Sequence, residues 1–387
     1  MPPERLDGLV VSRRVLVAVG AGGVGKTTTA AALGLAGAAR GRRVLCLTID
    51  PARRLAEALG LEQMSGEEQT VKLERFGLAD GASTGSTGSL VAMMLDTKRT
   101  FDDLIRKYAS TPERAGRLLN NKLYKYVSTS LAGTQEYMAM EKLVAVQSDP
   151  RFDLIVLDTP PTTNALDFLD APERLVEALD STAMGWILQA FESTGRVSLN
   201  LFARSASAVL RSIARIAGAG FLEAMAEFLT ELNDLFGGFR QRAVAVQTAL
   251  RSPEVTFVLV TSPAPMSIEE VLYFSDRLES ASLSRGAFVV NRFRLPPPHA
   301  ERPPTEDEAA RAIAGLRLKL DEGAPSRVVE AHADAVRLAA LDALHVKRLH
   351  ERVRGKVPIV RVPELPADVR DAKGLASVSR TLMTGGV

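Results

Sequence analysis

One segment near the N-terminus carries the strongest signal for the fold, and it reads Val15-Leu16-Val17-Ala18-Val19-Gly20-Ala21-Gly22-Gly23-Val24-Gly25-Lys26-Thr27-Thr28-Thr29. Its first five residues are apolar, which favours a buried strand. A glycine-rich turn follows, and the alanine-rich segment after it predicts a helix from about Lys26 to Ala39. Residues 20–27 match the spacing G-x-x-x-x-G-K-[ST], in the order of strand, loop and helix that a phosphate-binding loop requires.

The residue types in this loop suit an anion. Gly22, Gly23 and Gly25 let the backbone curl until successive N–H groups point inward, and the following helix adds the positive end of its dipole. Lys26 would then reach the β- and γ-phosphates, and the hydroxyl of Thr27 would hold Mg²⁺. The expected nucleotide-binding set from this stretch is Gly22, Gly23, Val24, Gly25, Lys26, Thr27 and Thr28. A glycine-rich turn without a ligand is the alternative, and the strand and helix on either side argue against it.

Composition narrows the class of protein. The 387 residues can bury a large core, and 48 basic against 46 acidic side chains leave a net charge of +2. Such a balance gives no global field toward nucleic acid, so no nucleic-acid partner is expected. No apolar run approaches the ~20 residues of a membrane span and no leader pattern is visible, so we expect a cytoplasmic protein without an integral membrane segment.

The single cysteine, Cys46, lies in an apolar run and is expected to be a small buried side chain. One thiol per chain excludes an internal disulfide, a paired-cysteine zinc site and a multi-thiolate metalloid site.

Further strands are predicted at 43–49, 152–157, 255–260, 287–290 and 358–362. The first two strands and the helix between them form a βαβ unit, which predicts a parallel sheet. Helical segments fall at about 89–147 and 172–251. The predicted fold is therefore α/β, a mostly parallel P-loop NTPase core with a helical subdomain inserted between strands, in one domain spanning 1–387.

Polar residues follow three of the predicted strands, where ligands of open parallel sheets bind. Asp158 ends an apolar strand as a Walker B carboxylate does and would hold a Mg²⁺-bound water opposite Thr27; a helix cap is the alternative. Asp50 is the candidate for orienting the attacking water, although Asp-Pro is also an ordinary turn. Lys26 and Asp50 are thus the expected catalytic residues, and Asn291 follows a late strand.

At these motifs the sequence resembles the ArsA-like anion-transporting ATPases, which include the arsenical-pump ATPase and the ATPase that targets tail-anchored membrane proteins. The matching pieces are the loop 20–27, Asp50-Pro51-Ala52, which is similar to switch I, and Asp158-Thr159-Pro160-Pro161-Thr162, which is similar to switch II. The resemblance implies ATP and Mg²⁺ as cofactors and a dimer that encloses the nucleotides. It also implies that Asn291 recognises adenine and that Pro363-Glu364 closes over the base.

One departure from the family bears on mechanism. Ala21 stands where members of the family carry a lysine that reaches the partner's nucleotide, so a homodimer of this chain is expected to hydrolyse slowly. A paralogous partner carrying that lysine could complete the site. Arg53 is a candidate substitute, with a solvated arginine as the alternative.

The leading hypothesis is a Mg²⁺-ATP-dependent, dimeric conformational switch that handles a protein or membrane-protein client with a paralogous partner. Residues 172–251 are either packed core or a groove for an apolar helix. The alternative function is a nucleotide-binding scaffold with negligible hydrolysis of its own. Two further functions are disfavoured. The sequence shows no concentrated basic face, as a DNA-segregation ATPase would need, and no recognisable acceptor-binding residues, as a small-molecule kinase would need.

Overall fold

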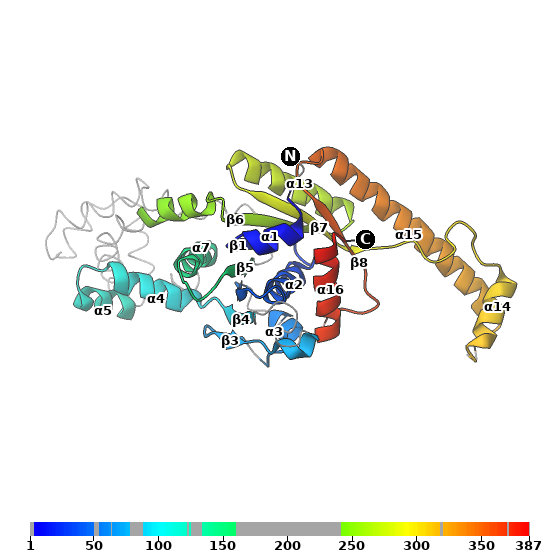
Figure 1. The fold of residues 1–387 in the computed structure, drawn as a ribbon, viewed down its shortest axis with the longest axis horizontal. Helices are drawn as coiled ribbons and strands as arrows, with labels where there is room; N and C mark the ends of the chain where they lie inside the picture. The colour runs from blue at the N-terminus through cyan, green and yellow to red at the C-terminus, as the bar shows by residue number, and fades with distance from the viewer. Residues whose placement is uncertain are drawn as a thin grey trace, which may run out of the picture.

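The computed structural model describes residues 4–49, 54–62, 64–77, 88–121, 124, 134–159, 241–317, 320–369 and 371–386. Their centre is an eight-stranded sheet with the order β3-β4-β2-β5-β1-β6-β7-β8 (Figure 1). Only the β3–β4 pair is antiparallel in this sheet. The strands are β1 Val15–Val19, β2 Arg43–Thr48, β3 Gln69–Thr70, β4 Ser89–Met94, β5 Leu154–Asp158, β6 Val255–Thr261, β7 Arg285–Phe293 and β8 Ile359–Pro363.

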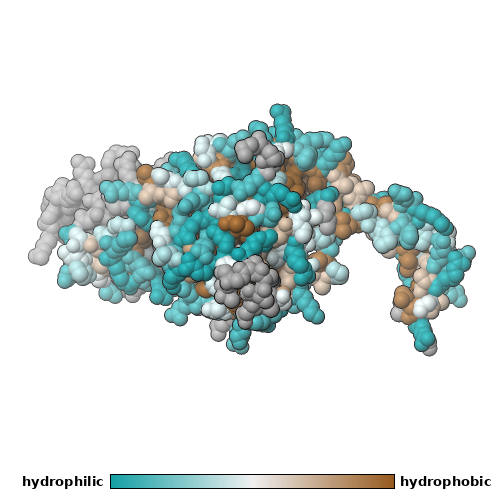
Figure 2. Space-filling view, viewed as in Figure 1, coloured by the Kyte–Doolittle hydropathy of each residue, from teal (hydrophilic) through white to brown (hydrophobic). Residues whose placement is uncertain are grey.

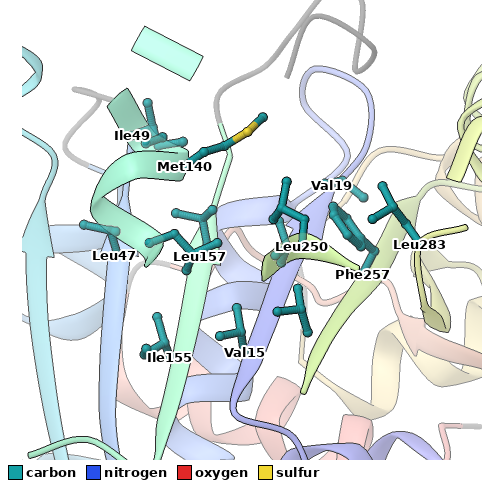
Figure 3. Close-up of a cluster of buried hydrophobic side chains, with 14 of the residues drawn as sticks. Val15, Val19, Leu47, Ile49, Met140, Ile155, Leu157, Leu250, Phe257 and Leu283 are labelled. Atoms are coloured by element: carbon teal, nitrogen blue, oxygen red, sulfur yellow. The ribbon is translucent and has the colours of Figure 1, made fainter. Parts of the chain in front are cut away.

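Helices cover both faces of the sheet because alternate residues of each strand point to opposite sides. Leu16 and Ala18 of β1 face a core built with α1 Leu6–Ser12, α2 Lys26–Ala38, α3 Arg54–Leu59 and α16 Ala372–Thr384. Val15, Val17 and Val19 face the other core, to which α4 Thr97–Tyr108, α5 Pro112–Asn120, α7 Thr134–Gln147, helical residues 241–250 and α13 Pro265–Ser280 contribute. In Figure 3, side chains of β1, β2, β5 and β6 meet Met140 of α7 and Leu250 in this second core.

The predicted α/β fold with a mostly parallel sheet is confirmed. The helical insertion expected from residue 89 begins later, because Ser89–Met94 is strand β4 and pairs along β2. A short apolar run is compatible with either element, and the neighbouring strand decides. Helices α1 and α16 and strand β3 were not anticipated. Of the expected insertion at 172–251, only 241–251 falls within the described residues, and 241–250 are helical there.

The described helices include none long and apolar enough to span a bilayer.

A two-helix arm extends from one end of the molecule (Figure 1). It consists of α14 Glu306–Gly315 and α15 Ala324–Val353, which pack against each other. The 30 residues of α15 correspond to about 45 Å at the usual helical rise. Figure 2 shows apolar side chains along this arm and where it leaves the body. Leu316, Leu338, Leu341 and Leu344 are among its exposed residues. The arm is inserted between β7 and β8, so its two ends join the final strands of the sheet.

Helix α2 lies unusually close to the sheet because glycines face it. A Cβ on Gly34 would lie 2.3 Å from the Sγ of Cys46, and one on Gly37 would lie 2.7 Å from a methyl of Leu154. No side chain fits at those distances without movement of the strand. The helix begins directly after the glycine-rich loop, with Gly25 as its N-cap.

We expect Gly34→Ala to lower the free energy of unfolding by about 1–2 kcal/mol, because overpacking outweighs the better helix propensity of alanine. Gly116→Ala in α5 is the matched control. No atom lies within 4 Å of the added Cβ there, so it should stabilise by up to about 1 kcal/mol. Urea unfolding measures both. Cys46→Ala combined with Gly34→Ala should recover much of the loss, and additive effects of the two substitutions would contradict the steric explanation.

Candidate functional site

The glycine-rich loop adopts backbone angles that favour glycine. Gly20, Gly23 and Gly25 have φ values of 154°, 76° and 98°. Space is also restricted, since a Cβ on Gly20 would lie 2.0 Å from the carbonyl oxygen of Val260, and one on Gly25 would lie 2.1 Å from the Nδ2 of Asn291. The loop is therefore held against β6 and β7 by contacts that only glycine permits.

The side chain of Lys26 folds back over this loop. Its Nζ donates hydrogen bonds to the carbonyl oxygens of Gly20 at 2.9 Å and Ala21 at 2.8 Å, and the residue is buried. An ammonium group is thus held against the backbone of the loop, at the N-terminus of α2. That combination of a fixed cation and a helix N-terminus attracts a phosphate group.

A cavity of about 820 Å³ opens from the loop. One end is formed by Gly23, Gly25 and the first turn of α2, the other by the ends of β7 and β8 and the segment after β8. The residues that line it are Gly23, Gly25, Lys26, Thr27, Thr28, Glu57, Thr159, Asn291, Arg292, Pro363, Glu364, Leu365, Pro366, Ala367, Asp368, Val369 and Val378. Its size is within the range of small-molecule sites.

Asn291 connects the two ends of the cavity. The pairing of β7 with β8 is irregular between Val290 and Phe293, and Arg292 within this irregularity has a φ of 58°. The bend directs Asn291 toward the loop, where its Nδ2 donates to the carbonyl oxygen of Val24 at 2.9 Å. One amide hydrogen is therefore engaged by the phosphate-binding loop itself.

Asp158 lies beneath the loop, at the end of β5. It is fully buried, and its Oδ2 accepts a hydrogen bond of 3.0 Å from the hydroxyl of Thr48, its register partner on β2. Thr159 adds a link to β1, because its hydroxyl donates to the carbonyl oxygen of Ala18 at 2.8 Å. The ends of β1, β2 and β5 are joined here by side chains, next to the start of the loop.

The structure brings most of the predicted site residues together. Thr27, Thr28, Asn291, Pro363 and Glu364 line one cavity with Lys26. Gly22 belongs to the loop without lining the cavity, and Val24 contributes its carbonyl to Asn291. Asp50, Arg53 and residues 160–162 lie outside the described residues, so the role of Asp50 stays a prediction.

Other residues of the site were missed from the sequence. They are Thr48 in β2, Glu57 in α3, Thr159 directly after β5 and Arg292 in β7, which line the cavity or support it. Thr159 and Arg292 directly follow predicted site residues, which was a usable signal. Glu57 has none, because only the packing of α3 against α2 and α16 brings it to the cavity.

The fold and this cavity define a P-loop NTPase. Comparison with known proteins extends the assignment, since a profile of the ArsA ATPase family, described as "Anion-transporting ATPase", matches residues 13–312. The chain belongs to this family, and it is accordingly a nucleotide-binding ATPase.

Curated relatives are similar across most of their length. The protein named ATPase GET3 of Malassezia globosa is 26% identical over 287 residues, covering 73% of each chain. That of Mycosarcoma maydis is 26% identical over 287 residues, 72% of this chain and 71% of its own. ATPase get3 of Aspergillus terreus is 26% identical over 349 residues, 89% of this chain and 88% of its own.

Cys46 lies in β2, two residues before Thr48, and is buried against α2. Burial, with a smaller contribution from the charge of Asp158, raises the pKa of its thiol from 9.0 to about 12. The thiolate, which is the reactive form, is therefore suppressed in the folded protein.

Native protein should resist alkylation by iodoacetamide from pH 7 to pH 9, because both access and the raised pKa oppose the reaction. Unfolding in guanidinium should expose the thiol and let it react to one equivalent per chain, since the sequence holds one cysteine. Mass spectrometry counts the adducts. Labelling of the folded chain that accelerates through pH 8–9 would show that Cys46 is accessible with an ordinary pKa.

Proposed function

We propose that this protein is a Mg²⁺-ATP-dependent ATPase that acts as a nucleotide-driven conformational switch in a dimer. The observation that carries the proposal is the continuous cavity from Lys26 and the loop to Asn291 and Pro363-Glu364. Its lining joins the phosphate-binding loop to an end with the amide of Asn291 and the largely apolar segment 363–367, a combination that would suit a nucleoside triphosphate. The curated relatives named ATPase GET3 support the same activity.

At the phosphate end, Lys26 and Thr27 line the cavity, whereas Asp158 is buried beneath the loop and is not part of the lining; we infer from this arrangement a site for Mg²⁺-ATP. Backbone N–H groups of the loop and the ammonium of Lys26 would bind the β- and γ-phosphates. Lys26 now donates to two loop carbonyls, and those hydrogen bonds would be exchanged for phosphate oxygens. Thr27 and Asp158 would hold Mg²⁺, directly or through water, because this ion retains waters and takes few protein ligands. When bound, Mg²⁺ would neutralise charge that develops on the phosphates.

At the base end, Asn291 is the proposed reader of adenine, and Pro363-Glu364 the segment that covers it. The hydrogen bond from Asn291 to Val24 fixes the amide so that one hydrogen is already used. Asp50 is proposed to orient the attacking water, since phosphoryl transfer depends on positioning more than on covalent chemistry.

The shortage of positive charge in the cavity lining supports the proposal that a second chain contributes a cation to the site. The described lining carries the cations Lys26 and Arg292 but the carboxylates Glu57, Glu364 and Asp368. A triphosphate needs more positive charge than this lining supplies, so Mg²⁺ and a cation from another chain would complete the site. Ala21 cannot provide that cation in a homodimer. We therefore propose slow hydrolysis by the homodimer and completion by a paralogous chain carrying the lysine.

The proposed setting is the cytoplasm, with a protein or membrane-protein client and no nucleic-acid partner. A scaffold that binds nucleotide without hydrolysing it is the second candidate, and Ala21 is the feature that favours it.

Hydrolysis by the purified chain tests the proposal. We expect wild type to bind Mg²⁺-ATP with slow turnover, Lys26→Ala to lose binding, and Ala21→Lys to raise turnover by about 10³-fold in a dimer. Phosphate release measures the rate, and light scattering measures the mass. Rapid turnover by wild type that Ala21→Lys leaves unchanged would refute the role assigned to position 21. Absence of turnover in both, with ATP bound, would favour the scaffold.

Thr48→Val tests whether the hydrogen bond from Thr48 orients the carboxylate of Asp158. Losing the hydroxyl should raise the Mg²⁺ concentration for half-maximal hydrolysis about tenfold, because partners that orient a metal-binding group contribute that much to metal affinity. Thr256→Val is the matched control. Thr256 is equally buried, and its hydroxyl is hydrogen-bonded to Ser284. It lies near the amino end of β6, whereas Thr48 and the loop lie at the carboxyl ends of the strands. An equal change in both variants would assign the effect to general destabilisation.

A further inference from the structure

Asp342 is a buried carboxylate that the proposed reaction does not use. It lies in the middle of α15, and its side chain is only 6% exposed. Its Oδ2 accepts the backbone N–H of Arg294 at 3.0 Å, and its Oδ1 lies 3.7 Å from the Nη1 of the same residue. Burying a carboxylate is costly unless it is paired and hydrogen-bonded. The position of Arg294 is therefore strongly constrained by α15.

Arg294 also reaches the base end of the cavity. Its Nε lies 3.5 Å from the Oε2 of Glu364, which lines that cavity. Arg294 itself comes three residues after Asn291, on the chain that leaves β7. One guanidinium thus joins the middle of the arm helix to the segment proposed to cover the base.

Backbone contacts reinforce this connection. The N–H of Glu364 donates to the carbonyl oxygen of Phe293 at 2.9 Å, and the guanidinium of Arg361 lies 5.2 Å from the ring of Phe293. The position of the end of β8 therefore depends on residues 293–294, and the position of these residues depends on Asp342. The phosphate end of the cavity, in contrast, is built by β1, the loop and α2. Within the described residues, the hydrogen bond and the ion pair of Asp342 both go to Arg294 and not to these elements.

We propose that Asp342 is a positioning residue for the base end of the nucleotide cavity, acting through Arg294 and Glu364, so that the placement of α15 sets affinity for the nucleobase. This inference rests on the proposed function, because it assumes that the cavity binds a nucleotide. It makes the two-helix arm part of the nucleotide site although α15 does not line the cavity. A displacement of the arm would then alter ATP affinity without touching the phosphate-binding loop.

Two ligands separate positioning from general stability. Mg²⁺-ATP uses both ends of the cavity, whereas inorganic tripolyphosphate with Mg²⁺ uses only the phosphate end. A residue that merely stabilises the fold would affect the two ligands equally. A residue that positions the base segment would weaken ATP alone.

The substitution Asp342→Asn keeps an acceptor for the N–H of Arg294 and removes the charge that holds its guanidinium. We expect it to weaken Mg²⁺-ATP about tenfold, as for loss of a charged hydrogen-bond partner, and to leave tripolyphosphate unchanged in calorimetric titration of the full chain. Arg294→Gln should also weaken Mg²⁺-ATP and leave tripolyphosphate unchanged. Because the Arg294 side chain is 40% exposed, this variant can be used for the test if Asp342→Asn does not fold. Asp334→Asn is the matched control on α15, where Asp334 pairs with Arg337 at the surface; it should change neither affinity.

The outcomes are distinct. Selective loss of ATP affinity in both variants supports the positioning role. Equal loss for both ligands, or unchanged ATP affinity, overturns it while leaving the proposed function intact. Failure of wild type to bind Mg²⁺-ATP would instead overturn the proposed function and this inference with it.

Discussion

Close contact between the glycine-rich loop and two neighbouring strands is the constraint on which the site depends. Gly20 touches the backbone of β6, and Gly25 touches Asn291 of β7. A single Cβ at either position would separate the loop from these strands. Because Asn291 then bonds to Val24, the same contacts that shape the phosphate-binding loop also position the residue proposed to read the base. The phosphate-binding loop and the residue proposed to read the base are therefore linked by packing and by a hydrogen bond.

The position of α2 follows from a related constraint. Small residues on the face toward the sheet let the helix lie close to β2 and β5, and its buried face consists largely of alanine, leucine and glycine. The N-terminus of this helix directly follows the loop, because Gly25 is its N-cap. The cost of the close packing is sensitivity, since it leaves no room for an added methyl at Gly34. The location of Cys46 in this contact is the reason that its thiol is buried and that its pKa is raised.

Strand order brings distant segments to one edge. The central β1 lies between β5 and β6, so Asp158 is adjacent to the loop although about 130 residues of sequence separate them. The arm between β7 and β8 shows the same effect on a larger scale. Its two ends connect to the adjacent strands β7 and β8. Its long helix carries Asp342, which is paired with Arg294 close to the cavity. An insertion that looks peripheral in Figure 1 is thus anchored at the site.

The phosphate-binding loop, the parallel α/β class and the family could be predicted from the amino-acid sequence, because these depend on local patterns: glycine spacing, apolar runs and the residues that end strands. The sequence also indicated Asp158, Asn291 and Pro363-Glu364 as site residues. Only the tertiary structure decided that Ser89–Met94 is a strand, since pairing with β2 outweighs an ambiguous period. It alone placed Thr48 under Asp158, Glu57 in the cavity and Asp342 behind Arg294. These residues acquire their roles from partners far away in the chain, and no local pattern encodes such contacts.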